Sequence, residues 1–481
     1  MANQLLATKH PHAAHSDAEG LSLDRTLGPW GLTALGIGAV IGGGIFVITG
    51  VAAAEHAGPA IVLSFIFAAI CCTFCALAYA EFAAMVPVSG SAYSYAYATL
   101  GELAAWFIGW MLVLEYGVSA SAVAVSWTGY FLSFLKHFDI VLPAVLVNAP
   151  LDAQLKPTGA IANVPAALLV LLLTWLCYVG IRKSAGANMA MVILKTALIV
   201  LVIVAGSFYV DTSNWHPFIP ENVAPGKYGW EGVLRGASMV FFAYIGFEAV
   251  SVAAQESPNP SRNLPIGMLA SLAICTVLYI GMALVMTGLT NYTQLGTAEP
   301  VVTAVASHPQ LMWLRVIVEI GALIGLASVV LVMVIGQPRI FMIMGRDGLL
   351  PPVFTRIHPK HRTPHVNTVI TGIGIALLAA IFPLDVLGDL TSMGTLIAFA
   401  AVCGGVLILR RTQPELPRPF RIMFAPLICL SGVTSCLVLL STMTAHNWML
   451  MIGWTLFGFA IYFFYGYRHS KLAAENRRGT P

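Results

Sequence analysis

The stretch Gly36-Ile37-Gly38-Ala39-Val40-Ile41-Gly42-Gly43-Gly44-Ile45-Phe46 lies in the middle of the first long apolar segment of the chain. Each of its five glycines costs a helix about 1 kcal/mol relative to alanine. Inside a bilayer, a broken helix must also find partners for its freed N–H and C=O groups, because no bulk water is present. Such backbone persists where it lines a cavity or holds a ligand. The stretch therefore indicates a binding site, with close helix packing through Gly38 and Gly42 as the alternative.

The composition of the chain is that of a helical protein with many membrane spans. Of the 481 residues, 58% are hydrophobic and 9% are charged, and the mean hydropathy is +0.84. Ordinary soluble domains carry about 25% charged residues, so a soluble protein of this length is excluded. Residues 1–24 are polar and have no apolar core, so we expect no cleaved signal peptide. We expect no nucleic-acid partner and no cofactor.

Apolar runs long enough to cross a bilayer, about 20 residues each, recur from end to end of the chain. No connection between them is long enough for a separate soluble domain. The sequence therefore predicts an all-α polytopic membrane protein with twelve spans, at about 30–54, 59–86, 101–128, 164–181, 187–209, 231–255, 266–290, 313–344, 366–382, 392–409, 422–441 and 447–467.

The distribution of Lys and Arg predicts how these spans are oriented. With a cytoplasmic N-terminus, seventeen of these residues fall in cytoplasmic tails and loops and only Lys136, Lys156 and Lys227 fall on the opposite side. Cytoplasmic loops of membrane proteins carry such an excess of positive charge, so both termini are expected to be cytoplasmic. The seventeen residues are Lys9, Arg25, Arg182, Lys183, Arg262, Arg346, Arg356, Lys360, Arg362, Arg410, Arg411, Arg418, Arg421, Arg468, Lys471, Arg477 and Arg478.

A second interrupted stretch, Phe241-Phe242-Ala243-Tyr244-Ile245-Gly246-Phe247-Glu248, lies in the sixth predicted span, five spans after the first. Glycine interruptions at corresponding positions of two halves are typical of transporters built from inverted repeats. An odd number of spans per repeat also gives the two repeats opposite orientations. The matched pair favours a binding site over packing, and it leaves the last two spans outside the repeats.

Ionisable residues at membrane depth are costly and are therefore candidates for function. Lys195 lies about two turns inside the fifth span, and we predict that it gains and loses a proton during transport. The alternative is an ammonium fixed on carbonyls of the broken first helix. Glu115, midway along the third span, is either a polar clamp between helices or part of a proton path. Glu81 is expected to be structural, Glu248 to hold the half-helix after the second break, and Glu319 to lie near the outer surface.

The cysteines and the N-terminal histidines do not indicate a metal site. All eight cysteines fall in apolar segments, so they are interpreted as small buried hydrophobes and not as a disulfide framework or metal ligands. The histidines at positions 10, 12 and 15 are interpreted as part of a solvated tail.

The interrupted stretches carry a family resemblance. Gly38 to Phe46 resembles the first-helix signature of the amino acid–polyamine–organocation superfamily, and Phe241 to Glu248 resembles the sixth-helix motif of its cationic amino acid transporter branch. Two loops are also similar to those of the superfamily: Pro87-Val88-Ser89-Gly90-Ser91-Ala92-Tyr93, and the run from Pro338-Arg339-Ile340-Phe341 to Gly345-Arg346-Asp347-Gly348-Leu349-Leu350-Pro351. The similarity covers nearly the whole chain in the right order.

The resemblance implies a LeuT-type 5+5 inverted repeat with twelve transmembrane helices, of which helices 1 and 6 are broken. It also implies secondary active transport of amino acids. The expected parts are a cytoplasmic N-terminal tail, two five-helix repeats, two peripheral helices and a cytoplasmic C-terminal tail, at residues 1–29, 30–209, 231–410, 422–467 and 468–481.

The resemblance further implies which groups hold the substrate. The carboxylate would rest on the N–H groups of residues 43–45, and the ammonium on carbonyls of residues 40 or 41 and 241–243, in agreement with the charges of helix ends. Lys195 matches the fifth-helix lysine that replaces a sodium ion in proton-coupled members, so Lys195 and Glu115 are the predicted proton-coupling residues. The predicted substrate-binding residues are Val40, Ile41, Gly42, Gly43, Gly44, Ile45, Phe241, Phe242, Ala243, Tyr244, Leu326 and Ala327.

One position departs from the family pattern. Relatives usually have Thr or Ser where this chain has Gly43, so a hydroxyl contact to the carboxylate is missing. The eighth-span stretch from Gly321 to Ser328, which is expected to line the side-chain pocket, is nearly apolar. A small or medium neutral amino acid is therefore at least as good a substrate candidate as arginine or lysine.

The leading hypothesis is a proton-coupled importer of amino acids in a bacterial-type inner (plasma) membrane, with protons and membrane lipid as its other partners. An amino acid or polyamine exchanger is the alternative. A channel would need a repeated filter or rings of like residues, and an intramembrane enzyme would need a catalytic cluster facing a cavity. The sequence shows neither pattern.

Overall fold

A computed structural model describes residues 2–8, 27–85, 91–179, 185–358 and 363–478 of the chain. Residues 9–26 of the predicted N-terminal tail, the Pro87–Gly90 part of the loop after the second span, and four of the predicted cytoplasmic cations between positions 182 and 362 lie outside this description. Within the described ranges the structure is helical, with two isolated β-bridges and no strand.

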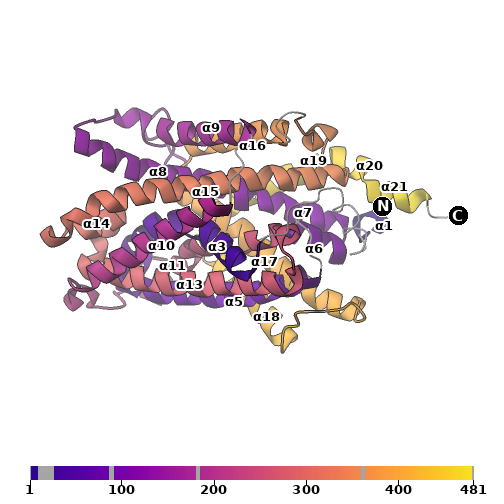
Figure 1. Cartoon of the computed structure of the whole chain (residues 1–481), viewed down its shortest axis with the longest axis horizontal. Coiled ribbons are helices and arrows are strands. Elements are labelled where there is room, and N and C mark those ends of the chain that lie inside the picture. Colours follow the sequence, from indigo (N-terminus) through magenta and orange to yellow (C-terminus); the bar gives the residue numbers. More distant parts are fainter. Residues whose placement is uncertain (1, 9–26, 86–90, 180–184, 359–362, 479–481) are drawn as a thin grey trace.

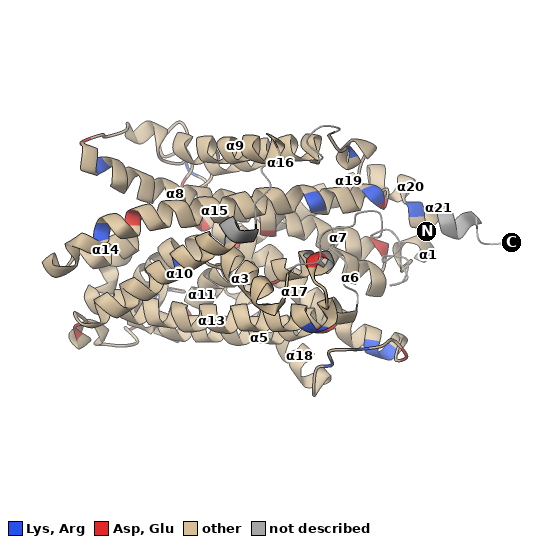
Figure 2. Ribbon diagram, viewed as in Figure 1, with Lys and Arg blue, Asp and Glu red and all other residues tan. Residues whose placement is uncertain are grey.

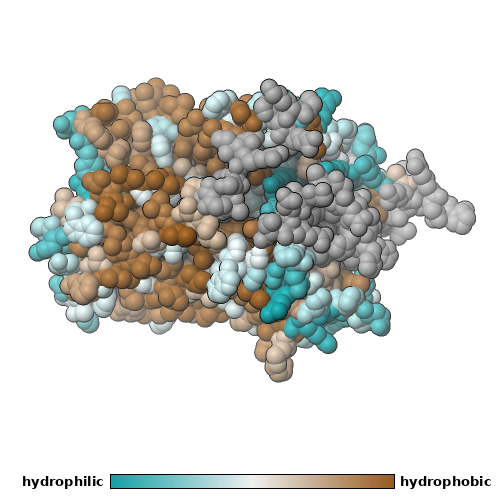
Figure 3. Space-filling view, viewed as in Figure 1, coloured by the Kyte–Doolittle hydropathy of each residue, from teal (hydrophilic) through white to brown (hydrophobic). Residues whose placement is uncertain are grey.

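Helices long and apolar enough to cross a membrane account for most of the described chain. Eight such stretches are present, together with four shorter apolar helices at Pro29–Val40, Val164–Val179, His365–Ile381 and Ala425–Ser441. Most of them run along the longest axis of the molecule, and α9 and α16 lie side by side at one edge (Figure 1). The visible face is brown in the middle and teal toward both ends (Figure 3), as expected for a protein girdled by lipid. This is a multi-pass membrane protein.

The first long apolar segment is broken where its glycines cluster. Helix α3 (Pro29–Val40) ends at Val40, and Ile41 adopts an extended backbone with φ −72° and ψ 98°. The chain turns helical again at Gly44 in the π-helical turn η1 (Gly44–Ile48), which continues into α4 (Thr49–Ala52) and η2 (Ala53–Ala57). The predicted interruption of this span is confirmed.

The sixth predicted span is broken in the same manner. Helix α11 (Gly229–Val240) runs into the 3₁₀ turn η8 (Phe241–Tyr244), Ile245 is extended, and a short helix α12 (Ala249–Val252) follows. Gly246 has φ +123°, a conformation that side chains other than that of glycine rarely adopt. This second interruption is confirmed as well.

The remaining helices pack around these two broken ones or lie at the edges of the molecule (Figure 1). They include α1 (Ala2–Leu5), α5 (Ile61–Met85), α6 (Ser91–Thr99), α7 (Glu102–Val113), η4 (Leu114–Val118), α8 (Ser119–Leu135), α9 (Val164–Val179), α10 (Ala185–Ser207), α13 (Pro260–Leu289), α14 (Pro300–Ala306), α15 (Met312–Arg346), α16 (His365–Ile381), α17 (Leu384–Thr412), α18 (Ala425–Ser441), α19 (Ala445–Ile461), η13 (Tyr462–Gly466), α20 (Tyr467–His469) and α21 (Lys471–Arg478).

The tenth predicted span was placed too late in the chain. Helix α17 begins at Leu384 and not near residue 392. Its first turns carry two aspartates, which break the apolar pattern on which the prediction rests. The structure accommodates Asp389 because Arg235 Nη2 lies 2.5 Å from its Oδ2 and Asn447 donates to the same oxygen at 2.6 Å. A carboxylate paired in this way no longer prevents a helix from lying in an apolar setting.

Two further buried carboxylates are also paired. Glu81 on α5 accepts from Nε and Nη2 of Arg410 at 2.8 and 2.5 Å. Glu319 on α15 accepts from Ser133 at 2.7 Å, and His137 and Arg315 lie 2.7 and 3.2 Å from its two oxygens. The ribbon between the two ends of the molecule is mostly tan, with few charged positions (Figure 2). Most of these bonds join different helices, and they give the buried carboxylates of Glu81 and Glu319 hydrogen-bond donors.

Candidate functional site

The two broken helices meet in the centre of the protein. A Cβ atom placed on Gly44 would overlap the Cα and Cβ of Ala243, and one placed on Gly246 would lie 2.8 Å from the carbonyl carbon of Ala39. Each break therefore has a glycine whose missing side chain admits the backbone of the other. Val40, Ile41, Ile45 and all of residues 241–244 are buried at this junction, each with at most 5% of its surface exposed.

Lys195 reaches the end of α3 from the neighbouring helix α10. Its Nζ donates to the carbonyl oxygens of Gly38, at 2.5 Å, and Ile41, at 2.9 Å, and only 1% of the residue is exposed. These are carbonyls at the C-terminal end of a broken helix, where the helix dipole favours a positive charge. The lysine is thus part of the break, as both interpretations of it from the sequence require.

Tyr279 on α13 joins the two breaks directly and was missed by the sequence analysis. Its hydroxyl lies 2.9 Å from the carbonyl oxygen of Val40 and 2.9 Å from that of Ala243. A tyrosine hydroxyl has one hydrogen, so it can satisfy only one of these acceptors fully at a time. One feature of the sequence could have pointed to Tyr279: it lies in the middle of an apolar span, where a buried hydroxyl needs a hydrogen-bond partner.

Helix η1 presents the N–H groups that were predicted to hold a carboxylate. It begins at Gly44, so the N–H groups of residues 44 and 45 belong to its first turn, where helical partners are missing. On the other side, Thr49 donates to the Gly44 carbonyl at 3.0 Å and Tyr130 to the Phe46 carbonyl at 2.6 Å. The carbonyls of Gly44 and Phe46 thus have hydrogen-bond donors, whereas the N–H groups at the start of η1 can bind an anion.

Ser126 on α8 lies beside the unusual Gly43. A Cβ atom on Gly43 would lie 2.9 Å from the Ser126 hydroxyl oxygen and 3.4 Å from its Cβ. The Ser126 hydroxyl itself donates to the carbonyl of Ala122 at 3.0 Å. The space toward which a side chain at position 43 would extend is therefore partly taken by a serine from the third span.

The predicted side-chain pocket on α15 is close to Lys195 through Gly325. A Cβ atom on Gly325 would lie 3.7 Å from the Lys195 Cβ and 3.8 Å from the Phe46 ring. Leu326 is fully buried and Ala327 is partly buried. The acidic side chain of α15, Glu319, does not contact this stretch but bonds Ser133 and His137 near the end of α8.

Glu115 and Glu248 face each other beside the second break. Both are 1% exposed. Glu248 Oε2 accepts from the N–H of Gly246 at 3.0 Å, whereas neither oxygen of Glu115 has an aligned donor among the described residues. The expectation that Glu248 holds the chain after the break fits this bond. The pairing of the two glutamates was not foreseen.

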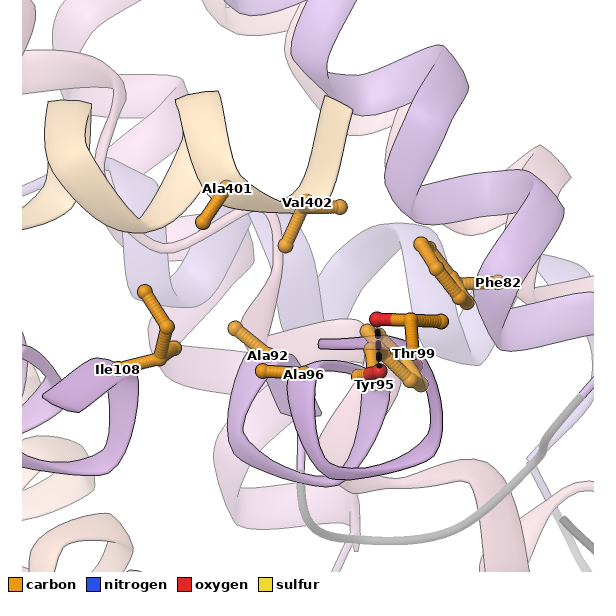
Figure 4. A pocket seen from close by; sticks show the side chains of 8 residues that line it. All are labelled: Phe82, Ala92, Tyr95, Ala96, Thr99, Ile108, Ala401 and Val402. Atoms are coloured by element: carbon orange, nitrogen blue, oxygen red, sulfur yellow. Dashed lines mark hydrogen bonds between the residues drawn. The ribbon is translucent and has the colours of Figure 1, made fainter. Parts of the chain in front are cut away.

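The pocket shown in Figure 4 lies elsewhere, between α5, α6, α7 and α17. It has no room for a water molecule and is lined mainly by apolar side chains, among them Phe82, Ile108 and Val402. The Thr99 hydroxyl at its edge donates to the Tyr95 carbonyl at 2.8 Å and is not free for a ligand. The junction of the two breaks, with its helix ends and charges, is the better candidate site.

Two broken helices that meet within the membrane-spanning region are typical of a transporter-type site. Comparison with known proteins agrees. The family model described as Amino acid permease matches residues 27–467, so the chain belongs to the amino acid permease family, within the amino acid–polyamine–organocation superfamily. It is a transporter and not an enzyme.

Three relatives show the breadth of the similarity. The chain is 45% identical over 451 residues to the branched-chain amino acid permease BcaP of Bacillus subtilis, covering 94% of this chain and 95% of that protein. It is 42% identical over 470 residues to the methylthioribose transporter of the same bacterium, covering 98% and 99%. It is 37% identical over 412 residues to the vacuolar cationic amino acid transporter 2 of Arabidopsis thaliana, covering 85% and 64%.

Proposed function

We propose that this protein is a proton-coupled symporter of neutral amino acids that works by alternating access. Its architecture would be the LeuT-type 5+5 inverted repeat, with α18 and α19 as the two peripheral helices. The support is the matched pair of breaks, which lie five spans apart and touch at the centre. Pro29–Val40 and the start of the stretch Gly44–Met85 would together form the first span, and the remainder of Gly44–Met85 would form the second.

The substrate would bind across the junction of the breaks. Its carboxylate accepts from the N–H groups of residues 43–45 at the start of η1, and its ammonium takes one of the two carbonyls that share the Tyr279 hydrogen. Because Tyr279 cannot satisfy both carbonyls, an ammonium adds a donor where one is lacking. This arrangement uses backbone groups alone and needs no side-chain hydroxyl at position 43.

The position of Lys195 is the observation that carries the proposed coupling. Its ammonium bridges the carbonyls of Gly38 and Ile41 at the break, a place where a cation is needed to stabilise freed acceptors. Loss of its proton would weaken the hold of α10 on the first helix and so couple protonation to the geometry of the site. Glu115 is the second proposed proton carrier, because it is buried beside the second break and ionisable residues at membrane depth are costly unless they serve a function.

A neutral side chain is favoured over a cationic one. The α15 stretch beside the site is apolar around Leu326 and Ala327, and a buried cation without a paired acid is costly. The most extensively matched amino acid transporter among the relatives described above is named for branched-chain substrates. Leucine, isoleucine and valine are therefore the first substrates to test.

Uptake into proteoliposomes tests this proposal. Labelled leucine, arginine and methylthioribose would be supplied with and without an inward proton gradient, and with or without unlabelled substrate inside. We expect accumulation of leucine that requires the gradient and no internal substrate. Uptake that depends only on internal counter-substrate would mean an exchanger, and preference for methylthioribose, which has neither carboxylate nor ammonium, would contradict the proposed cradle.

The proposed location and orientation rest on the distribution of positive charges along the chain. We propose a bacterial-type inner (plasma) membrane with both termini cytoplasmic, supported by the excess of Lys and Arg in alternate loops. Cysteine accessibility at one engineered position in each loop, measured in intact cells, would test the orientation. Labelling of the 134–163 connection only after the cells are opened would contradict it.

A further inference from the structure

Four cysteines from three helices converge at one point in the membrane-spanning region. Cys71 and Cys75 lie one turn apart on α5, Cys403 lies on α17 and Cys436 on α18. The Sγ of Cys436 is 3.7 Å from the Sγ atoms of both Cys71 and Cys75, and the Sγ of Cys403 is 3.9 Å from that of Cys75. All four thiols are reduced, and each residue is at most 1% exposed.

The spacing of the Cys71, Cys75 and Cys436 sulfurs suits a metal site. In tetrahedral zinc sites the metal–sulfur distance is about 2.3 Å, which places neighbouring sulfurs about 3.8 Å apart. The Cys436–Cys71 and Cys436–Cys75 sulfur distances, both 3.7 Å, agree with this value. The sulfurs of Cys71, Cys75 and Cys436 also lie within 4.8 Å of one another, so no side chain must travel far to surround one ion.

The fold itself brings these sulfurs together. Residues 71 and 75 are at i and i+4 and so share one face of α5. Gly432, one turn before Cys436, lets α18 approach α17 closely, since a Cβ there would lie 2.8 Å from the Cys403 Sγ. The interpretation of the cysteines as buried side chains holds, but burial alone does not explain why sulfurs so far apart in the sequence share one point.

We propose that Cys71, Cys75 and Cys436 form a buried thiolate site for a soft, thiophilic metal ion of the Zn(II) or Cu(I) class, with the Cys403 thiol at its edge beside Cys75. Thiolate sulfur selects such ions over hard cations such as Mg²⁺ and Ca²⁺. Binding releases protons from the thiols, because the ligand is the thiolate. The ion ties α5 to the peripheral helix α18.

Metal content of the purified protein tests the site. Because the sulfurs are buried, the ion must be supplied during synthesis, so the full chain would be produced in cells grown with zinc or, separately, with cobalt, and purified with its thiols reduced. The histidines at positions 10, 12 and 15 would be replaced by alanine in every sample to remove a competing site in the tail. We expect one ion per chain and, with cobalt, the sulfur-to-metal charge-transfer absorption of a tetrahedral thiolate site.

Two substitutions and one control decide the outcome. Cys436→Ala, which removes the sulfur shared by two edges, should lower metal content at least tenfold, and Cys403→Ala should lower it less. Cys275→Ala, on α13 and outside the cluster, should leave it unchanged. Protein that elutes as a folded monodisperse species but holds no metal, or holds the same amount after Cys436→Ala, would overturn the proposal.

Discussion

Gly44, in the first broken helix, lies directly against Ala243 in the second. A Cβ atom on Gly44 would overlap both the Cα and the Cβ of Ala243 and lie 3.0 Å from its backbone nitrogen. Backbone atoms cannot swing aside as the end of a flexible side chain can. The glycine is therefore required for the contact between the two broken helices, and the proposed substrate binding depends on the same residue as this packing.

Gly44→Ala is expected to lower stability and abolish transport. Overpacking of a tight contact costs about 1–3 kcal/mol, so the melting temperature in detergent should fall and leucine uptake should be lost. Gly388→Ala is the matched control, because a Cβ on this buried glycine of α17 would lie 3.5 Å from Ile48 Cδ1 in ordinary contact. Unchanged melting and uptake in Gly44→Ala would show that the two breaks do not touch as described.

Tyr279→Phe is expected to make the substrate-free protein less stable but more strongly stabilised by substrate. Loss of the hydroxyl leaves the carbonyls of Val40 and Ala243 without their shared donor, at a cost of about 1–3 kcal/mol. A substrate ammonium then has no competitor for those carbonyls. Thermal melting with and without saturating leucine measures both effects.

Ser271→Ala serves as the control for this variant. It lies on the same helix, and its hydroxyl bonds the Met268 carbonyl of that helix at 2.9 Å. Its melting temperature and its shift with leucine should both resemble those of the unmodified protein. A Tyr279→Phe protein whose leucine shift stays the same would place the ammonium elsewhere.

Both helix interruptions could be predicted from the sequence, because they depend on local features. Glycines lower helix propensity, and an apolar run shows that little water is present to pair with freed backbone groups. The sequence did not show which side chains from other helices lie beside the two breaks. Tyr279, Ser126 and the Glu115–Glu248 pair become neighbours only through the packing of distant helices. The late start predicted for α17 has the same origin, since Asp389 lies in an apolar region only because Arg235 and Asn447 reach it from other helices.

Gly43→Ser tests whether Ser126 explains the unusual glycine. The new Cβ would lie 2.9 Å from the Ser126 hydroxyl, closer than side chains normally approach, so the single variant should bind leucine more weakly. Removing that oxygen with Ser126→Ala in the same protein should restore binding, and the added hydroxyl should then strengthen it severalfold. Ser126→Ala alone is the control. Equal leucine affinities in the single and double variants would show that Ser126 does not explain the glycine at position 43.

Glu81→Gln is expected to destabilise the protein without altering the coupling of transport to protons. The partly buried Arg410 would be left with a neutral partner, so the protein should lose part of the stability that a fully buried pair would provide. Melting temperature should fall, while the ratio of leucine uptake with and without the gradient should stay constant for the folded fraction. A changed ratio would move Glu81 from a structural role to the transport mechanism.

Lys195→Met separates a proton-linked lysine from a fixed one. Methionine fills a similar volume but leaves the Gly38 and Ile41 carbonyls without the ammonium. If protonation of Lys195 drives the cycle, gradient-driven accumulation of leucine should be lost, while exchange of labelled for unlabelled leucine across the membrane persists at a measurable rate. A lysine that only holds the first helix predicts a different pattern, in which accumulation and exchange fall together with the melting temperature. Lys195→Arg is the informative companion, because it keeps a charge on the carbonyls that does not dissociate at physiological pH. It should rescue stability in both cases, and it should rescue accumulation only if the proton on residue 195 does not take part in the cycle.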